Sequence, residues 1–152
     1  MLTIRRAKVA DAVSLAPRLR DADRDECKAA LGMEPEVVLP MLVQQGTFVW
    51  AAKDPEGIVQ GLFGVDPQDD TFGIVWMVTS PAILKHRKEL VRLTPKWLER
   101  RHRARPLLGN YHDARNQLHI RWLRRLGFSF LKTDPQYGFE QRPFHQFARL
   151  RS

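Results

Sequence analysis

Hydrophobic and polar positions recur along the chain with two periods, one typical of strands and one typical of helices. Leu2–Arg5 indicates a short, edge-like strand. Apolar residues then recur at helical spacing from Val9 to about Leu31, with an interruption or offset near Pro17. A second short helix is indicated over Glu36–Gln45. The chain is therefore expected to begin with one strand followed by helices.

Three strands are predicted next. Thr47–Ala52 is rich in β-forming residues and meets the turn sequence Asp54–Gly57, which joins it to Ile58–Val65 as a hairpin. Phe72–Thr79 reads FGIVWMVT, an almost continuous apolar run of the kind that lies in the middle of a sheet. We expect this run to be the central strand.

A helical segment follows the central strand. Ser80 is a cap signal and Pro81 a first-turn signal, so we expect a helix to begin close to Pro81. Thr94-Pro95 repeats the signal. Either the helix breaks there and restarts, or the proline kinks one long helix, and we favour the break.

The last third of the chain alternates strand, helix and two strands. The predicted elements are the strand Leu107–Tyr111, the helix Asn116–Leu126, and the strands Phe128–Thr133 and Phe144–Leu150. Gly127 follows the helix and allows the positive φ that commonly ends one. The order βααβββαβαββ, without repeats or linkers, predicts an α/β domain.

Composition agrees with a single globular domain. The 152 residues are 43% hydrophobic and 28% charged, which suffices for one real core. No apolar run approaches membrane-spanning length, and the start MLTIRRAK lacks the apolar core of a signal peptide, so we expect a soluble, unexported protein. The single Cys27 excludes an internal disulfide or a cysteine-rich zinc site and is expected to pack in a helix.

The net charge of +8 is concentrated in one stretch. Lys85–Arg125, the basic region, holds thirteen lysines and arginines against three acidic residues. Such a field recruits nucleic acid, phosphorylated cofactors or acidic protein surfaces, and the alternative is a merely solvated face. Because no zinc-finger, RNA-recognition or helix-turn-helix signature appears, binding of nucleic acid would act through phosphates and depend strongly on salt.

The element order and the late helix resemble the GCN5-related N-acetyltransferase (GNAT) superfamily. Many members carry Asn-x-x-Ala-x-x-x-Tyr-x-x-x-Gly-Phe, and Asn116, Gly127 and Phe128 stand at the matching spacing. The chain is more closely similar to the small acetyltransferase-like internal virion proteins of short-tailed bacteriophages. These proteins share a T-S segment before a basic helix, then N-Y, then N-x-x-H-I-R-x-L-x-x-x-G. The matching positions here are Thr79-Ser80, Asn110-Tyr111 and Asn116 through Gly127.

The resemblance implies a single GNAT-like α/β domain over residues 1–152, with a mixed central sheet of about six to seven strands flanked by helices. It also implies a location in the host cytoplasm or the phage virion, with a protein partner in either. A helix between two strands implies a right-handed crossover. We therefore expect Phe72–Thr79 and Leu107–Tyr111 to be adjacent, roughly parallel strands that diverge at their C-terminal ends.

Acetyl-coenzyme A is the cofactor that the resemblance implies. In the superfamily, the splayed central strands bind the pantetheine arm, and the next helix N-terminus holds the pyrophosphate. Trp76–Thr79 would line the arm and Ser80–Ile83 would face the phosphates. Asn116 would either help to bind the cofactor or cap its helix. The implied cofactor residues are Trp76, Met77, Val78, Thr79, Ser80, Lys85, Arg87, Lys88 and Asn116.

Two features depart from the superfamily pattern. Its phosphate loop typically reads Arg/Gln-x-x-Gly-x-Gly/Ala, whereas SPAILKHR has no glycine, and Pro81 lacks an N–H donor. The tyrosine that commonly protonates the leaving thiolate is replaced by Leu123. Three hypotheses stay open: an N-acetyltransferase, a catalytically silent module that binds a virion or host protein, and a basic nucleic-acid-binding protein.

Other residues could supply acid–base chemistry. His112 and Asp113 follow the strand Leu107–Tyr111, where a histidine could act as base for an amine, and Tyr111 could donate a proton. The alternative is a His/Asp pair with a capping or surface role. His119 is expected to be a packed histidine on its helix. No histidines and carboxylates share a helical metal spacing, so no metal site is predicted.

The remaining aromatic and histidine residues have simpler expectations. Trp50, Trp76 and Trp122 are expected to pack in the core. Trp97 lies between charged neighbours and is the best candidate for a surface ring that stacks on an adenine or a nucleobase. His86 and His102 are expected to contribute to the charge of the basic region.

Overall fold

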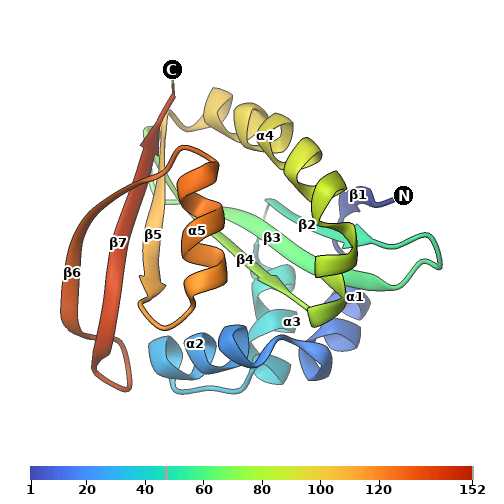
Figure 1. The fold of residues 1–152 in the computed structure, drawn as a ribbon, viewed down its shortest axis with the longest axis horizontal. Helices are drawn as coiled ribbons and strands as arrows, with labels where there is room; N and C mark the ends of the chain where they lie inside the picture. Colours follow the sequence, from blue (N-terminus) through green and yellow to red (C-terminus); the bar gives the residue numbers. More distant parts are fainter. Residues whose placement is uncertain (47, 152) are drawn as a thin grey trace.

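The computed structural model describes residues 1–46 and 48–151 (Figure 1). One mixed sheet of seven strands, in the order β1-β2-β3-β4-β5-β7-β6, is flanked by helices. The expected single-domain α/β class, with six to seven strands, is confirmed. Within the described ranges, no helix is long and apolar enough to cross a membrane.

The strands and helices follow the predicted order with one helix more. The strands are β1 (Thr3–Arg6), β2 (Phe48–Lys53), β3 (Val59–Pro67), β4 (Phe72–Thr79), β5 (Leu107–Asp113), β6 (Ser129–Tyr137) and β7 (Arg142–Leu150). The helices are α1 (Val9–Leu15), α2 (Asp21–Leu31), α3 (Pro35–Gln45), α4 (Arg87–Ala104) and α5 (Gln117–Arg125). Residue 47, the first of the predicted strand Thr47–Ala52, lies outside the described residues.

The predicted helix from Val9 to Leu31 is divided at Pro17, as its interruption indicated. The chain tightens into a 3₁₀ turn over Ala16–Arg18, because proline offers no N–H to continue the α-helical ladder. α2 then begins at Asp21 and ends at Leu31, and it is capped by Gly32, whose φ of 69° lies in the left-handed region. This second helix runs beside the C-terminal end of β5 in Figure 1.

The predicted hairpin between β2 and β3 is confirmed by antiparallel pairing of the two strands. The Asp54 carboxylate closes its turn by accepting bonds from the backbone N–H groups of Glu56 and Ile58. β4 is also central as predicted, because it pairs with β3 on one side and with β5 on the other.

The predicted break at Thr94-Pro95 is wrong. A 3₁₀ turn over Pro81–His86 leads into α4, which continues through Pro95 to Ala104. The Thr94 hydroxyl donates to the Leu90 carbonyl at 2.6 Å, within the same helix. A proline inside a helix costs about 3 kcal/mol, and the burial of Leu90 and Trp97, which lie on either side of Pro95 in α4, offsets this cost.

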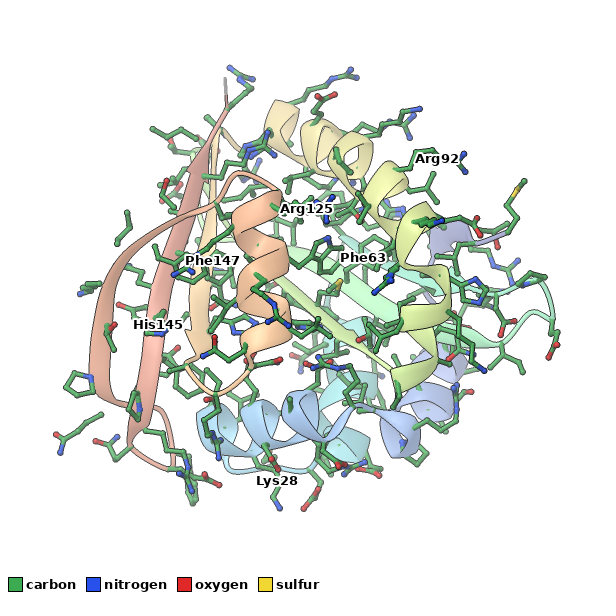
Figure 2. All side chains as sticks on the ribbon, viewed as in Figure 1. Lys28, Phe63, Arg92, Arg125, His145 and Phe147 are labelled. Atoms are coloured by element: carbon green, nitrogen blue, oxygen red, sulfur yellow. The ribbon has the colours of Figure 1, made fainter. Side chains whose placement is uncertain are left out.

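Two hydrophobic layers enclose the sheet. α1 and α3 pack on one face, against residues that include Ala51 and Leu62. α4 and α5 pack on the other face, against residues that include Phe63 and Phe147. Figure 2 shows Phe63 and Phe147 within the body of the molecule, whereas Arg92 extends from the outer side of α4.

The predicted surface role of Trp97 is wrong. Its side chain is buried, with ring centroids 5.6 Å from Trp50 and 4.9 Å from Phe63 in edge-on contacts. The charged neighbours Lys96 and Arg100 are exposed, since they occupy the outer face of the same helix. Trp50, Trp76 and Trp122 are half-buried and pack against the hydrophobic clusters.

His102 does not contribute to the basic surface as predicted. It is buried, and its Nδ1 lies 3.2 Å from the Pro106 carbonyl. Burial, helped by the charge of Arg149, lowers the pKa of His102, so its imidazole favours the neutral form. The basic surface of α4 therefore comes from its exposed lysines and arginines, such as Arg100 and Arg103.

Candidate functional site

The sheet opens between β4 and β5. The two strands pair in parallel only over Phe72↔Leu107, Gly73↔Leu108 and Ile74↔Gly109. Beyond these pairs the Asn110 amide donates to the Val75 carbonyl at 3.1 Å, across the gap between the strands. β4 continues to Thr79 and β5 to Asp113, without further pairing between described residues. The predicted divergence of these strands is confirmed, and we call this opening the fork.

A cavity of about 280 Å³ lies at the fork. Its walls come from β4, β5 and the helices on both sides of the sheet, and most of them are apolar. The side chains of Asp23, Glu26, Tyr111, His112 and His119 supply polar groups. A mostly apolar cavity with a few convergent polar groups is the usual form of a small-molecule site.

Only some of the predicted cofactor residues at the end of β4 and just after it line the cavity. Trp76, Met77 and Val78 line the cavity, whereas Thr79 and Ser80 are buried beside it. Thr79 donates its backbone N–H to Asp23 and accepts from the N–H of Arg20, both at 2.9 Å.

Ser80 is also fully engaged. Its hydroxyl donates to the side-chain oxygen of Gln60, and its backbone N–H donates to the Gln60 carbonyl. Thr79 and Ser80 therefore fix the end of β4 against its neighbours.

The predicted basic cofactor residues lie outside the cavity. Lys85, Arg87 and Lys88 are exposed on the 3₁₀ turn and at the start of α4. They follow β4 directly in the chain, with only the turn from Pro81 between them and the strand.

Asn116 is almost completely buried, with 1% of its surface exposed. It stands at the N-cap position of α5, but its side chain makes no capping hydrogen bond. Of the two alternatives for Asn116, the capping role is therefore excluded. Its amide donates to Asp23 Oδ1 at 2.8 Å, and its carbonyl oxygen lies 3.4 Å from the guanidinium of Arg20.

Six side chains form what we call the polar cluster: Arg20, Asp23, Glu26, His112, Asn116 and His119. They come from α2 and the residue before it, from the end of β5, and from the first half of α5 and the residue before it. Asp23 is its centre, since Oδ1 contacts Arg20, Asn116 and His119 and Oδ2 accepts from the backbone of Thr79. As predicted, His119 is a packed histidine, with Nδ1 3.3 Å from Asp23.

Glu26 has a different environment. Its Oε1 accepts the N–H of Asp113 at 3.1 Å, lies 3.2 Å from His112 Nδ1 and is 3.5 Å from the Asn116 amide. Its Oε2 has no hydrogen-bond partner among the described residues. The side chain keeps 24% of its surface exposed and lines the cavity.

Burial shifts the pKa values of the two carboxyl groups and the two histidines of the cluster in the direction of their neutral forms. Burial raises the pKa of Asp23, against the lowering effect of the Thr79 N–H and Arg20. Burial raises the pKa of Glu26 well above its ordinary value, and the charge of Asp23 adds to this. Burial lowers the pKa of His112 to about 4 and that of His119 to about 3. Such perturbed groups beside a cavity are typical of functional sites.

Of the three predicted catalytic candidates, two line the cavity and one does not. Tyr111 and His112 line the cavity, and the Tyr111 ring stacks on Tyr137 with centroids 4.5 Å apart. Asp113 is buried away from it and pairs with Arg115 at 2.7 Å. His112 and Asp113 do not follow the strand as predicted but are its last two residues, because pairing with β7 extends β5.

Sequence reasoning missed Arg20, Asp23 and Glu26. The signal was the spacing of three between Asp23 and Glu26, which places both carboxylates on one face of a helix. On an amphipathic helix, such residues are normally solvated. Within residues 1–46 and 48–151, no group of three or more histidine, cysteine and acidic side chains could hold a metal ion.

No protein-family model matches the sequence, and no curated protein sequence matches it. Solved structures do match the fold over nearly the whole chain. An acetyltransferase of the GNAT family from Bacillus anthracis has a TM-score of 0.75 at 14% identity, over 99% of this chain and 95% of that one.

Two further structures are similar. The ribosomal-protein-S18-alanine N-acetyltransferase from Escherichia coli has a TM-score of 0.71 at 15% identity, over 100% of this chain and 95% of that one. A putative acetyltransferase from Salmonella typhimurium, solved with its cofactor acetyl-CoA, has a TM-score of 0.69 at 17% identity, over 99% and 94%. The chain therefore has the fold of the GNAT-family acetyltransferases.

Proposed function

We propose that this chain binds acetyl-coenzyme A in the fork and transfers the acetyl group to an amine. The fork itself is the observation that carries the proposal. The Val75 carbonyl faces β5, and Met77, two residues further along β4, presents its backbone groups on the same edge. Because pairing with β5 ends at Ile74, this edge is open to an extended ligand. The pantetheine arm, with its amide groups, can bind it as a peptide binds a free strand.

The remaining cofactor contacts are proposed from the positions of residues that line the fork or directly follow β4. Trp76, Met77 and Val78 enclose the arm, and the exposed side chains of Lys85, Arg87 and Lys88 attract the phosphates. The turn over Pro81–His86 has no glycine, and its proline lacks an N–H, so side-chain charge replaces a backbone cradle. Contacts of Thr79, Ser80 and Asn116 with the cofactor stay predictions. One similar structure was solved with acetyl-CoA, which supports this ligand.

Calorimetric titration with acetyl-coenzyme A tests the proposal. We expect a micromolar dissociation constant, weakened by raised salt because exposed charges hold the phosphates. Replacing Lys85, Arg87 and Lys88 by alanine should weaken binding, whereas Lys132→Ala, an exposed lysine on β6, should not. Release of free thiol in the presence of a primary amine then measures transfer.

Absence of heat at millimolar acetyl-coenzyme A would instead favour the catalytically silent binding module. Loss of the backbone cradle and of the usual tyrosine supports this second candidate. The bacteriophage context, the virion or host protein partner, the location in the host cytoplasm or virion and nucleic-acid binding by the basic region stay predictions.

A further inference from the structure

We infer that the outer side of α4, together with the adjoining end of β1, binds the phosphate backbone of nucleic acid. Two groups of side chains form this surface. The first, which we call the cation row, lies on α4 and consists of Arg92, Lys96, Arg100 and Arg103. The second, which we call the arginine–tryptophan stack, consists of Arg6, Trp50 and Arg101. This binding does not depend on the proposed function.

The cation row follows the solvent side of α4. Its members are spaced four, four and three residues apart, so they lie on one side of the helix and span about 16 Å. All four side chains are exposed, and none forms an ion pair with a residue that the structure describes. Figure 2 shows Arg92 extending away from the body of the molecule. Glu99 is the only acidic residue between Leu90 and Arg105, so positive charge dominates this side of the helix.

The helix dipole does not account for the cation row. Like charges four residues apart destabilise a helix. The negative end of the dipole stabilises cations only in the last turn, where Arg103 lies. Arg92 and Lys96 lie before that turn and gain nothing from it. A polyanion bound along the helix would offset their mutual repulsion.

The arginine–tryptophan stack places further guanidinium groups beside the row. The guanidinium carbon of Arg101 lies 4.2 Å from the centroid of the Trp50 ring, and that of Arg6 lies 4.9 Å from it. Trp97 packs edge-on against Trp50 and fixes the position of its ring. A guanidinium that stacks by its face presents the N–H groups of its edge, which match two phosphate oxygens.

Arg101 has no anionic partner in the part of the chain that the structure describes. Its guanidinium makes neither a hydrogen bond nor an ion pair there, and its Nε–H is buried without an acceptor. Burial lowers the pKa of Arg101, and the charges of Arg100 and Arg6 add to this effect. A half-buried cation beside two others is costly. A phosphate would supply both the acceptor and the counter-charge.

Other buried donors without acceptors lie on the same part of the chain. Among the described residues, the buried side-chain nitrogen and oxygen atoms without a hydrogen-bond partner are Trp97 Nε1, Arg101 Nε, His102 Nε2 and Arg105 Nε. Positions 97, 101 and 105 are four residues apart and therefore form one stripe along the end of α4. All three atoms on this stripe carry N–H groups, and buried donors are normally paired. The stripe therefore favours an anionic ligand.

The absence of an apolar anchor on α4 favours nucleic acid over an acidic protein. Protein interfaces depend on a desolvated apolar or aromatic centre. In α4, which the structure describes in full, the only exposed large apolar side chain is Val91, with 36% of its surface exposed. Phosphates need no such anchor, because counterion release supplies the affinity of sequence-independent binding.

This surface is distinct from the proposed acetyl-coenzyme A site. Lys85, Arg87 and Lys88 lie before or at the start of α4, whereas Arg101 lies about 21 Å from Arg87 along the helix axis. The two sites therefore bind their ligands independently, and acetyl-coenzyme A should not displace nucleic acid.

Fluorescence anisotropy tests the binding, with a labelled thymidine strand of about 20 nucleotides and a mixed-sequence duplex of equal length. Wild type should bind both. Arg92→Gln/Lys96→Gln should weaken binding of the strand at least about tenfold at about 50 mM salt, and its salt slope should flatten by about 1.4, since two phosphate contacts are lost. Lys8→Gln/Lys132→Gln is the matched control, because it removes two exposed lysines elsewhere and should change the Kd less than about twofold.

Arg101→Lys isolates the contribution of the arginine–tryptophan stack. Lysine keeps the charge but has no planar group that lies on Trp50 and presents a bidentate edge. We expect binding of the strand to weaken about three- to tenfold with an unchanged salt slope, whereas Arg101→Gln should also flatten the slope by about 0.7. Thermal unfolding verifies that both variants fold. The row variant, whose side chains are exposed, decides the matter if they do not.

Four results would overturn the inference. They are no binding of either nucleic acid by wild type, equal losses in the row variant and its control, displacement of the strand by polyglutamate at an equal concentration of charge, and displacement by acetyl-coenzyme A. Polyglutamate displacement would assign the surface to acidic proteins, and displacement by acetyl-coenzyme A would place the strand at the fork. Wild-type affinity of Arg101→Lys would refute the role of the stack. Failure of acetyl-coenzyme A to bind would refute the proposed function alone.

Discussion

Replacing Asn116 by alanine tests the polar cluster most directly. The substitution removes the 2.8 Å bond to the Asp23 carboxylate from a position where 1% of the surface is exposed. A hydrogen bond to a charged group contributes about 1.5–3 kcal/mol. The contacts with Arg20 and Glu26, at 3.4 and 3.5 Å, are long and add little. We expect Asn116→Ala to lower the free energy of unfolding by about 2–3 kcal/mol.

Urea denaturation at pH 7, followed by circular dichroism, measures this change. For a chain of this size the melting temperature should fall by about 2–4 °C per kcal/mol. Gln117→Ala is the matched control, because the neighbouring Gln117 donates an exposed hydrogen bond to the Ala114 carbonyl. The control should cost no more than about 0.5 kcal/mol.

A double-mutant cycle identifies the source of the loss. If the bond to Asp23 carries the effect, Asn116→Ala should cost less in an Asp23→Asn background, with a coupling of about 0.5–3 kcal/mol. A loss below about 1 kcal/mol, or one equal to the control, would refute this reasoning. Unchanged stability with abolished acetyl-coenzyme A binding would instead show that Asn116 contacts the cofactor.

Three further predictions follow from burial and charge. The lowered pKa values of His112 and His119 contribute stability above pH 6.5 that is lost as pH falls toward about 4 and 3. The raised pKa values of Asp23 and Glu26 act in the opposite direction. The variant His112→Gln/His119→Gln should therefore lose less unfolding free energy than wild type between pH 6.5 and 4. An equal dependence of the unfolding free energy on pH in both proteins would contradict the conclusion that the two imidazoles are buried and neutral. Trp97→Ala should cost about 3–5 kcal/mol in urea denaturation, and the half-buried Trp122 less; equal losses would argue against the burial of Trp97. If the basic region binds duplex DNA, Arg100→Glu/Arg103→Glu should weaken the mobility shift and flatten its salt dependence, while Lys132→Glu should not.

The parallel pairing of β4 with β5 could be predicted because its determinants are local in sequence, whereas the divergence of the two strands was implied by the resemblance to the superfamily. Phe72–Thr79 is apolar throughout, and a helix separates it from the next strand, so a central strand and a parallel neighbour follow from pattern and handedness. The hairpin after β2 is predictable for the same reason. Its turn residues close it within a few positions.

The polar cluster could not be predicted in this way. Asp23 and Glu26 occupy polar positions of a helix, and nothing nearby distinguishes them from solvated residues. Their partners lie about 90 positions later, in β5 and α5. The errors at Pro95 and Trp97 have a related cause. Local signals favoured a break and a surface ring, but packing of α4 on the sheet determined both outcomes.

The separation of 93 residues between Asp23 and Asn116 has a consequence during synthesis of the chain. At about 5–20 residues per second, roughly 5–20 s pass between the translation of these two residues. During that time α2 lacks both α5 and the β6–β7 hairpin, whose turn donates from Phe139 and Glu140 to the carbonyls at the end of α2. The nascent chain thus leaves the ribosome with two acidic groups and a helix end still hydrated. Ribosome-bound fragments that end before α5 should therefore be cut by proteases within α2.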